Sequence, residues 1–435
     1  MSDITLQPIL EPFKARIAPP GSKSLTNRAL VLAALADGTS TLSNVLFADD
    51  TVVMLDALKS LGIHCEIDSK SRTVIVHGTN GTIPTTAAEL FCGNSGTTIR
   101  FLAALCTLGQ GSYTLDGIAR MRQRPIRQLV DLLRNLGTRV EYLGEDGFPP
   151  IKILADKLPG GILTYGSAAS SQYLSAVLMS CPHARHEVHV DLQGTQTSWP
   201  YVAMTMQLMD RFGHTVELIR DTNTGDPKQI IVPLGNYVGT NYPVEPDASN
   251  AAYFLAIAAV HKGAEITIEG LGNQSLQGDI GFANVLKKMG ADVKIDKQSI
   301  TVKGTGTLEG VDVNFLDMPD QAQTLAVTAM FAEGETIIRG LHTLKLKETD
   351  RLQALSNELQ KFGAKVEIEN DSALKITPPK IIRRAEVDTY DDHRMAMSFS
   401  IAATKVEHVV IRNKECVNKT YPEYFEDLEK VRKQM

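Results

Sequence analysis

An internal repeat is the feature of this sequence that most restricts its fold. A helical run, a glycine and an alternating strand-like segment recur five times along the chain. Glycine directly after an amphipathic helix is typical of a left-handed helix C-terminus, and the alternation that follows predicts a strand. Successive copies are 75, 76, 77 and 73 residues apart, and their glycines are Gly62, Gly137, Gly213, Gly290 and Gly363.

A second series of segments lies between these signatures. Each opens with Ser, Asp or Pro-Asp, which suit a helix N-cap, and then becomes apolar nearly all round, as a buried helix does. Together the two series predict six units of about 72–75 residues, each with one buried helix, one amphipathic helix and several short strands. The segments begin at residues 22, 95, 167, 246, 319 and 391.

The spacing of the units predicts two domains. At 435 residues the chain is too long for a single core. The longest step between buried segments, 79 residues, contains the stretch 235–243, a candidate crossover. The sixth unit ends near 424–426 without its final strands, which the alternating segment 4–17 would supply. We therefore expect a first domain of residues 1–20 plus 241–435, a second of residues 21–240, and crossovers near 20 and 240.

Composition excludes several classes of protein. With 44 Lys and Arg against 50 Asp and Glu, the net charge of −6 argues against binding of nucleic acid through a chain-wide basic field. The five cysteines form no CxxC pair, so neither a disulfide framework nor a zinc ribbon is indicated. There is no 18-residue apolar run and no secretion signal, which predicts a cytoplasmic protein without a membrane span.

Polar openings of buried helices indicate an anionic ligand, because a helix N-terminus carries partial positive charge and unpaired N–H groups. Each opening has an ordinary alternative: a capped helix start with snorkelling cations, a glycine loop or a solvated basic loop. Arginine in such a loop suits bidentate binding of phosphate or carboxylate. The candidates are Lys23, Ser24 and Arg28, then Asn94 and Gly96, then Arg124 within the four-arginine stretch 120–127.

The remaining candidates add hydroxyl and titratable groups. The segments 170–172 and 197–201 suit a hydroxylated ligand, although helix capping explains them equally well. Asp320, the stretch 347–351, the stretch 391–394 and Lys419 carry the charged groups of the second half. The 391–394 stretch offers too few ligands for a metal site, so no metal is expected, and no nucleophile signature is present.

Eight segments, in order from residue 19 to 425, resemble the EPSP synthases (3-phosphoshikimate 1-carboxyvinyltransferases): PGSKSLTNRA, GNSGTTIRFL, RMRQRPI, SSQYLSA, PDQAQTLA, LKLKETDR, YDDHRMAM and NKTYPEYF. The resemblance implies an α/β fold, a two-domain inside-out barrel of six βαβαββ repeats with hinges near 20 and 240. It implies a cofactor-free monomer that binds phosphoenolpyruvate and shikimate 3-phosphate in a cleft. The enolpyruvyl group would pass to the shikimate 5-hydroxyl, with release of phosphate, in the shikimate pathway.

The resemblance also implies roles for individual residues. Asp320 would be the base on the 5-hydroxyl, Glu348 the proton donor to the methylene carbon, and Lys23 a third catalytic residue touching both ligands. Shikimate 3-phosphate would contact Lys23, Ser24, Arg28, Ser170, Ser171, Gln172, Ser198, Tyr201, Asp320, Thr343 and Lys347. Phosphoenolpyruvate would contact Lys23, Asn94, Gly96, Arg124, Gln172, Arg351, Arg394 and Lys419.

Three positions depart from the family pattern: Ser95, Phe101 and Thr343 stand where Ala, Pro and Asn are expected.

The nearest alternative function is that of the sister transferase acting on UDP-N-acetylglucosamine. That transferase typically carries a cysteine in the loop corresponding to 116–127, where this chain has none. A non-catalytic anion-binding protein would lack Asp320 or Glu348. An RNA-end-processing enzyme on a related fold would be strongly basic.

Overall fold

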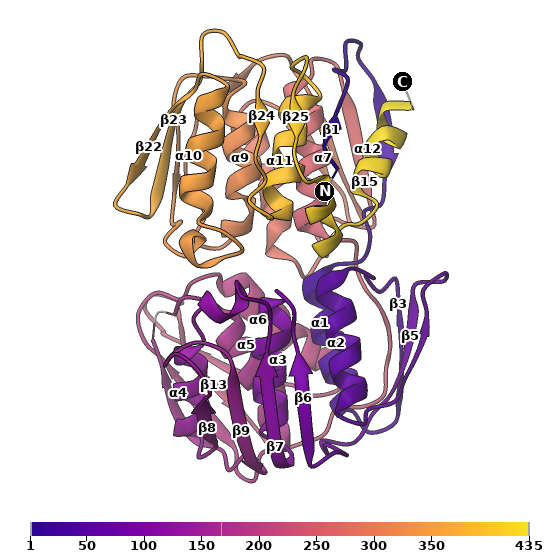
Figure 1. Cartoon of the computed structure of the whole chain (residues 1–435), viewed down its shortest axis with the longest axis vertical. Helices are drawn as coiled ribbons and strands as arrows, with labels where there is room; N and C mark the ends of the chain where they lie inside the picture. Colours follow the sequence, from indigo (N-terminus) through magenta and orange to yellow (C-terminus); the bar gives the residue numbers. More distant parts are fainter. Residues whose placement is uncertain (1, 167, 434–435) are drawn as a thin grey trace. The chain divides into compact units, whose positions relative to one another are not determined.

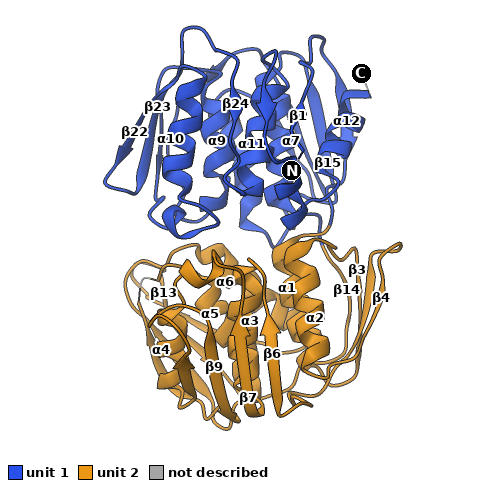
Figure 2. Cartoon of the chain, viewed as in Figure 1, with its two compact units in different colours: residues 1–20, 245–435 blue, residues 21–244 orange. Residues whose placement is uncertain are grey.

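The computed structural model describes residues 2–166 and 168–433 (Figure 1), which form two compact units. Unit 1 combines residues 1–20 with 245–435, and unit 2 comprises residues 21–244 (Figure 2). Unit 2 ends at Val244, four residues beyond the predicted bound of 240, because β14 (Asn241–Pro243) pairs in parallel with β3 (Thr39–Ser43) of unit 2. That the crossovers act as hinges stays a prediction.

The described residues of unit 2 form three four-stranded sheets of one design. In the second sheet β6 (Ala87–Phe91) is parallel to β7 (Gln110–Asp116), and β7 is antiparallel to β9 (Ile151–Asp156), whose other neighbour is β8 (Arg139–Tyr142). The three strand orders are β14-β3-β5-β4, β6-β7-β9-β8 and β10-β11-β13-β12. The other strands are β4 (Cys65–Asp68), β5 (Thr73–His77), β10 (Gly161–Tyr165), β11 (Val188–Leu192), β12 (Glu217–Arg220) and β13 (Pro227–Val232).

Each repeat of unit 2 has one helix buried on all sides. In α3 (Gly96–Cys106) every residue is buried, and the helix packs against α1 (Lys23–Leu35), α5 (Gln172–Ser180) and the strands β7 and β9 (Figure 1). The third repeated segment begins at Ser167, which lies outside the described residues. Three helices keep an exposed face, as their amphipathic patterns predict: α2 (Asp49–Ser60), α4 (Arg127–Asn135) and α6 (Trp199–Arg211).

Unit 1 repeats this design and uses the N-terminal segment twice. Strand β2 (Lys14–Ile17) is parallel to β15 (Glu265–Glu269), and β1 (Ile4–Thr5) is antiparallel to β25 (Val410–Ile411) in the three-stranded sheet of the sixth repeat. The strand orders are β16-β17-β15-β2, β19-β21-β23-β22, β1-β25-β24 and β18-β20. The other strands are β16 (Asp292–Ile295), β17 (Ser299–Lys303), β18 (Leu308–Glu309), β19 (Asp312–Asn314), β20 (Ala332–Glu333), β21 (Thr336–Arg339), β22 (Lys365–Glu369), β23 (Ala373–Thr377) and β24 (Glu386–Val387).

Three mutually packed helices form the centre of unit 1: α7 (Ala248–Val260), α9 (Ala322–Ala329) and α11 (His393–Ala403). All their residues are buried, and their many alanines allow close approach of the helix axes. The outer helices are α8 (Phe282–Lys288), α10 (Arg351–Lys361) and α12 (Tyr424–Lys433). Short 3₁₀ segments in the chain are η1 (Met121–Gln123), η2 (Cys181–His183), η3 (Gly278–Gly281), η4 (Pro319–Gln321), η5 (Leu344–Leu346) and η6 (Lys414–Lys419).

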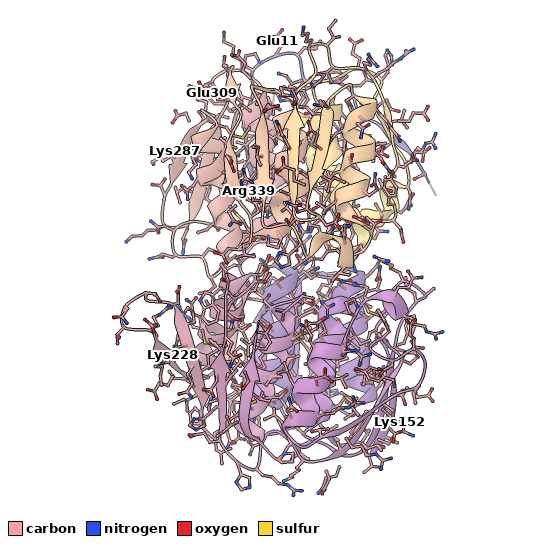
Figure 3. The ribbon with its side chains drawn as sticks, turned by 90° about the vertical axis from the view of Figure 1, so that its left-hand side faces the viewer. Glu11, Lys152, Lys228, Lys287, Glu309 and Arg339 are labelled. Carbon is pink, nitrogen blue, oxygen red and sulfur yellow. The ribbon has the colours of Figure 1, made fainter. Side chains whose placement is uncertain are left out.

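The outer surfaces of both units are charged. Lys228 of β13, Lys287 of α8 and Arg339 of β21 are exposed (Figure 3). Across the described part of the chain, no helix combines the length and the apolarity needed to cross a bilayer.

Candidate active site

In unit 2 the predicted site residues gather at the N-terminal ends of the buried helices. Ser22 caps α1 by accepting a hydrogen bond from the Leu25 amide at 3.4 Å, and Ser95 caps α3 by accepting one from the Thr98 amide at 3.3 Å. Ser171 occupies the N-cap position of α5 without a side-chain capping bond. These helix starts present backbone N–H groups and partial positive charge to a ligand.

Lys23 begins α1 beside a buried carboxylate. Its Nζ lies 3.2 Å from Oδ2 of Asp50, a residue in the first turn of α2. The Asp50 carbonyl in turn accepts hydrogen bonds from Ser95 Oγ at 3.3 Å and Thr98 Oγ1 at 3.1 Å. Because Asp50 is held on both sides, its carboxylate fixes the position of the Lys23 ammonium.

Arg28 is fully buried one turn further along α1. Its guanidinium donates to the carbonyls of Ser24 (3.0 Å) and Tyr201 (3.3 Å) and to the hydroxyls of Thr205 (2.7 Å) and Ser175 (3.2 Å). Within the described residues no carboxylate pairs with it, and burial lowers the pKa of Arg28 to about 10. These contacts join α1 to α5 and α6 and hold the guanidinium group in place.

Arg100 is a candidate that the sequence analysis does not assign. Its guanidinium donates to Gln172 Oε1 at 2.6 Å and Ser170 Oγ at 3.3 Å, and it lies 5.0 Å from the ring centre of Tyr173. Gln172 in turn donates from Nε2 to Thr97 Oγ1 at 3.3 Å. Arg100 thereby orients the polar residues at the start of α5. The only feature of the sequence that could have indicated this role is the position of a cation inside an apolar helix.

Only one arginine of the 120–127 stretch is buried at a helix start. Arg124 donates from one terminal nitrogen to the Asn94 carbonyl at 2.8 Å and to Asn94 Oδ1 at 3.2 Å. A Cβ on Gly96 would lie 2.6 Å from the other terminal nitrogen, so this contact requires glycine. The other three arginines are less buried: exposed Arg122 pairs with Asp116, exposed Arg127 with Asp146, and half-buried Arg120 with Gln123.

Ser198 and Tyr201 stand at the start of α6. Ser198 is its N-cap and adopts the left-handed conformation, with φ 54°, directly before Trp199 and Pro200. A residue with a side chain is rarely held in this conformation. It turns the chain into the helix, and the Tyr201 carbonyl then accepts from Arg28 and Thr205.

In unit 1 the predicted residues form a charge cluster around Arg351, the first residue of α10. Its side chain is 1% exposed and contacts three carboxylates. Nε lies 2.7 Å from Asp392 Oδ2, and the terminal nitrogens lie 3.1 Å from Asp320 Oδ1 and 2.9 Å from Glu348 Oε2. Burial alone would lower the pKa of Arg351, but Asp392, Glu348 and Asp320 together raise it above its usual value.

Asp320, which lies in the turn η4, is close to three cations. Besides Arg351, its Oδ2 lies 3.0 Å from an Arg394 nitrogen and its Oδ1 lies 3.4 Å from Lys347 Nζ. Arg394 also donates to the hydroxyl of Tyr253 at 3.3 Å, and burial raises the pKa of that hydroxyl to about 12. Asp320 is therefore held by three cationic groups of the kind that also attract anionic ligands.

Glu348 is the second candidate acid or base and is nearly buried. Oε2 pairs with Arg351, and Oε1 lies 3.7 Å from Lys419 Nζ, which η6 supplies. Asp320 and Glu348 share Arg351 but differ in their other cationic partners, an arrangement that suits one base and one acid.

Comparison with known proteins decides the family. A model of the EPSP synthase family (3-phosphoshikimate 1-carboxyvinyltransferase) matches residues 9–428. This chain belongs to the EPSP synthase family. Curated relatives named 3-phosphoshikimate 1-carboxyvinyltransferase include those of Vibrio vulnificus (strain YJ016), 44% identical over 431 residues and 98% of each chain, and of Sulfurovum sp. (strain NBC37-1), 45% identical over 434 residues and 99% of each chain.

Solved structures agree with this assignment. An EPSP synthase from Acinetobacter baumannii matches with a TM-score of 0.79 and 28% identity, covering 98% of this chain and 97% of that one. The predicted fold class is confirmed, and the alternative transferase acting on UDP-N-acetylglucosamine is not favoured.

Among the positions that depart from the EPSP synthase pattern, Thr343 has a distinctive setting. It precedes η5 and is buried, and its hydroxyl has no hydrogen-bond partner among the described residues. Phe101 lies under Arg28, 5.1 Å from ring centre to guanidinium carbon. Asp50 and Arg100 escape the sequence analysis because their partners come from other helices, and Asp392 appears there only as part of a motif.

Proposed function

We propose that this protein transfers the enolpyruvyl group of phosphoenolpyruvate to the 5-hydroxyl of shikimate 3-phosphate, with release of inorganic phosphate. The reaction belongs to the shikimate pathway, which leads to chorismate and the aromatic amino acids. The observation that carries the proposal is the family match over residues 9–428. The three carboxylates and four cations of the Arg351 cluster support acid–base chemistry on anionic substrates.

Unit 2 supplies most of the binding groups in this proposal. Its helix N-termini and Lys23 suit a phosphate, and the hydroxyls at 170–171 and 198 suit a polyhydroxylated ring. The proposed contacts of shikimate 3-phosphate are Lys23, Ser24, Arg28, Ser170, Ser171, Gln172, Ser198, Tyr201, Asp320, Thr343 and Lys347. Those of phosphoenolpyruvate are Lys23, Asn94, Gly96, Arg124, Gln172, Arg351, Arg394 and Lys419.

Asp320 and Glu348 divide the proton transfers. Glu348 donates a proton to the methylene carbon of phosphoenolpyruvate, which makes the adjacent carbon electrophilic. Asp320 takes the proton of the 5-hydroxyl as its oxygen adds to that carbon and forms a tetrahedral intermediate. The intermediate then loses a methyl proton and phosphate, restoring the double bond. No oxidation state changes, so the proposed reaction needs no redox cofactor.

Competition between substrate and Asp320 for the same cations is part of this proposal. Arg394 and Lys347 pair with Asp320. The carboxylate and phosphate groups of the substrates attract the same side chains. We propose that substrate binding draws these cations towards the ligands, leaving Asp320 a stronger proton acceptor.

The assay that tests the function measures phosphate release from phosphoenolpyruvate with shikimate 3-phosphate or UDP-N-acetylglucosamine as acceptor. We expect release only with shikimate 3-phosphate. Release only with the nucleotide sugar would overturn the acceptor, and release with neither would overturn the enzymatic proposal. Lys23→Ala is expected to abolish turnover, whereas Lys228→Ala, an exposed lysine of β13, leaves it unchanged.

We further propose a cytoplasmic monomer. Free thiols support a reducing compartment: all five cysteines lie among the described residues, and none forms a disulfide. Sedimentation equilibrium of purified protein tests the monomer, since a dimer would double the measured mass. Fractionation of the source cells tests the compartment.

A further inference from the structure

Two histidines and a glutamate share one face of the first sheet of unit 2. His64 precedes β4, Glu66 lies within it, and His77 ends β5. The His77 amide donates to the His64 carbonyl at 3.0 Å, which places these two residues opposite each other. Side chains two residues apart on a strand point to the same face, so Glu66 joins them. Cys65, between His64 and Glu66, points to the other face.

The donor atoms of these side chains converge. Glu66 Oε1 lies 2.8 Å from His77 Nε2 and 3.9 Å from His64 Nε2, and the two imidazole rings stack with centres 4.9 Å apart. One donor atom from each residue lies within 4.8 Å of the others. Bonds of about 2.0–2.1 Å to a tetrahedral Zn²⁺ place its ligands about 3.3 Å apart, within the range already present.

A neighbouring hydroxyl orients one of the imidazoles. His77 Nδ1 lies 3.3 Å from Oγ1 of Thr39 on the adjacent strand β3, with its Nε2 turned towards Glu66. Histidines that bind metal commonly use their other ring nitrogen in such a hydrogen bond, which fixes the tautomer. The side chains of His64, Glu66 and His77 are 70%, 55% and 42% exposed, so an ion would reach them from solvent and keep water in its remaining position.

We propose that His64, Glu66 and His77 form a binding site for a divalent transition-metal ion, best matched by Zn²⁺. Two imidazole nitrogens and one carboxylate oxygen are ligands typical of zinc, and a water molecule completes the tetrahedron. None of the three residues belongs to the candidate active site. The bound ion bridges β4 and β5 and thereby stabilises the folded sheet.

An ordinary histidine–glutamate ion pair is the competing explanation, and the chain contains one for comparison. On β11, His189 Nε2 lies 2.7 Å from Glu187 Oε1 with similar exposure. Among the described residues that pair has no third ligand, since only the His64 group brings three such donors together. The two sites therefore form a matched test of whether the third ligand creates a metal site.

The experiment titrates untagged, chelator-treated full-length protein with ZnCl₂ and measures bound zinc by isothermal titration calorimetry. We expect one ion per chain, with binding at least about tenfold weaker in His64→Gln, Glu66→Gln and His77→Gln. His189→Gln and Cys65→Ser should bind like the unmodified protein. Absence of zinc binding, or equal binding by the His64 and His77 variants, overturns the proposal.

Thermal stability provides a second readout. Saturating zinc should raise the unfolding temperature by about 2–4 °C or more in the unmodified protein and not in His64→Gln. A shift that persists in His64→Gln contradicts the assignment. Phosphate release from phosphoenolpyruvate should be the same in unmodified protein and His64→Gln, since none of the three proposed ligands belongs to the candidate active site.

Discussion

The helix starts of unit 2 and unit 1 have the same architecture but differ in the chemical groups that bind their arginine side chains. In unit 2, Arg28, Arg100 and Arg124 donate hydrogen bonds to hydroxyl, amide and carbonyl oxygens. In unit 1, Arg351 and Arg394 are bound by carboxylates. Hydroxyl, amide and carbonyl oxygens fix a guanidinium group in place, whereas carboxylates can in addition accept and donate protons. In the proposed reaction, this difference between the partners of the arginines would separate binding from proton transfer, although the fold of the two units repeats.

The largest expected effect comes from removing the charge of Asp320. Asp320→Asn keeps the size of the side chain but cannot take the hydroxyl proton, so we expect kcat to fall by about 10²–10⁴-fold with a smaller change in KM. Steady-state phosphate release with shikimate 3-phosphate measures this. Asp312→Asn, an exposed partner of Arg339, is the control. A kcat within a few-fold of the unmodified protein would remove Asp320 from the proton transfer.

Loss of Arg351 tests the same cluster through stability. Arg351→Met leaves three carboxylates close together without their shared buried cation, so we expect unfolding free energy to drop by about 3–5 kcal/mol. Urea denaturation at pH 7 measures the change. Arg339→Met, which breaks an exposed pair with Asp312, should cost less than about 1 kcal/mol. Equal losses in the two variants would contradict the difference between buried and exposed pairing.

Acid should destabilise unit 2 through a buried histidine. Burial, and secondarily His214, lowers the pKa of His183 from 6.5 to about 4. The unfolded chain takes up this proton at a higher pH than the folded chain, so the stabilising contribution of neutral His183 is fully present above pH 6.5. As the pH falls towards 4, the free energy of unfolding drops by about 3 kcal/mol. Denaturant midpoints at pH 7.5 and 4.5 should lie closer together in His183→Asn than in the unmodified protein. The same pH dependence in both would refute this role.

The smallest expected effect comes from changing the contact between Gly96 and Arg124. Gly96→Ala places a methyl group against the guanidinium and shifts it, so we expect the KM for phosphoenolpyruvate to rise about tenfold. The KM for shikimate 3-phosphate should change less. Gly166→Ala, where a Cβ meets nothing within 4 Å, is the control. A rise confined to shikimate 3-phosphate would assign Arg124 to the other ligand.

The repeats were predictable because helix stops and buried helices leave periodic marks in the sequence. The position of the boundary between the two units, at residue 244, could not be predicted to the residue, since β14 is three residues long and is defined by its pairing with β3. The four arginines in 120–127 cannot be told apart from the sequence. Their partners distinguish them: Arg122 pairs with Asp116, whereas Arg124 donates to Asn94. Long-range pairing, which no local pattern records, decided which candidates gather at a helix start.

The double use of the N-terminal segment has a consequence for synthesis on the ribosome. Lys14 pairs with Glu265 and Ile4 with Ile411, so both N-terminal strands emerge long before their partners. At about 5–20 residues per second, β2 waits roughly 12–50 s for β15. During this interval residues 21–244 can complete their own three sheets. Nascent chains thus pass through a stage in which one half is folded and an unpaired leading edge is available to chaperones.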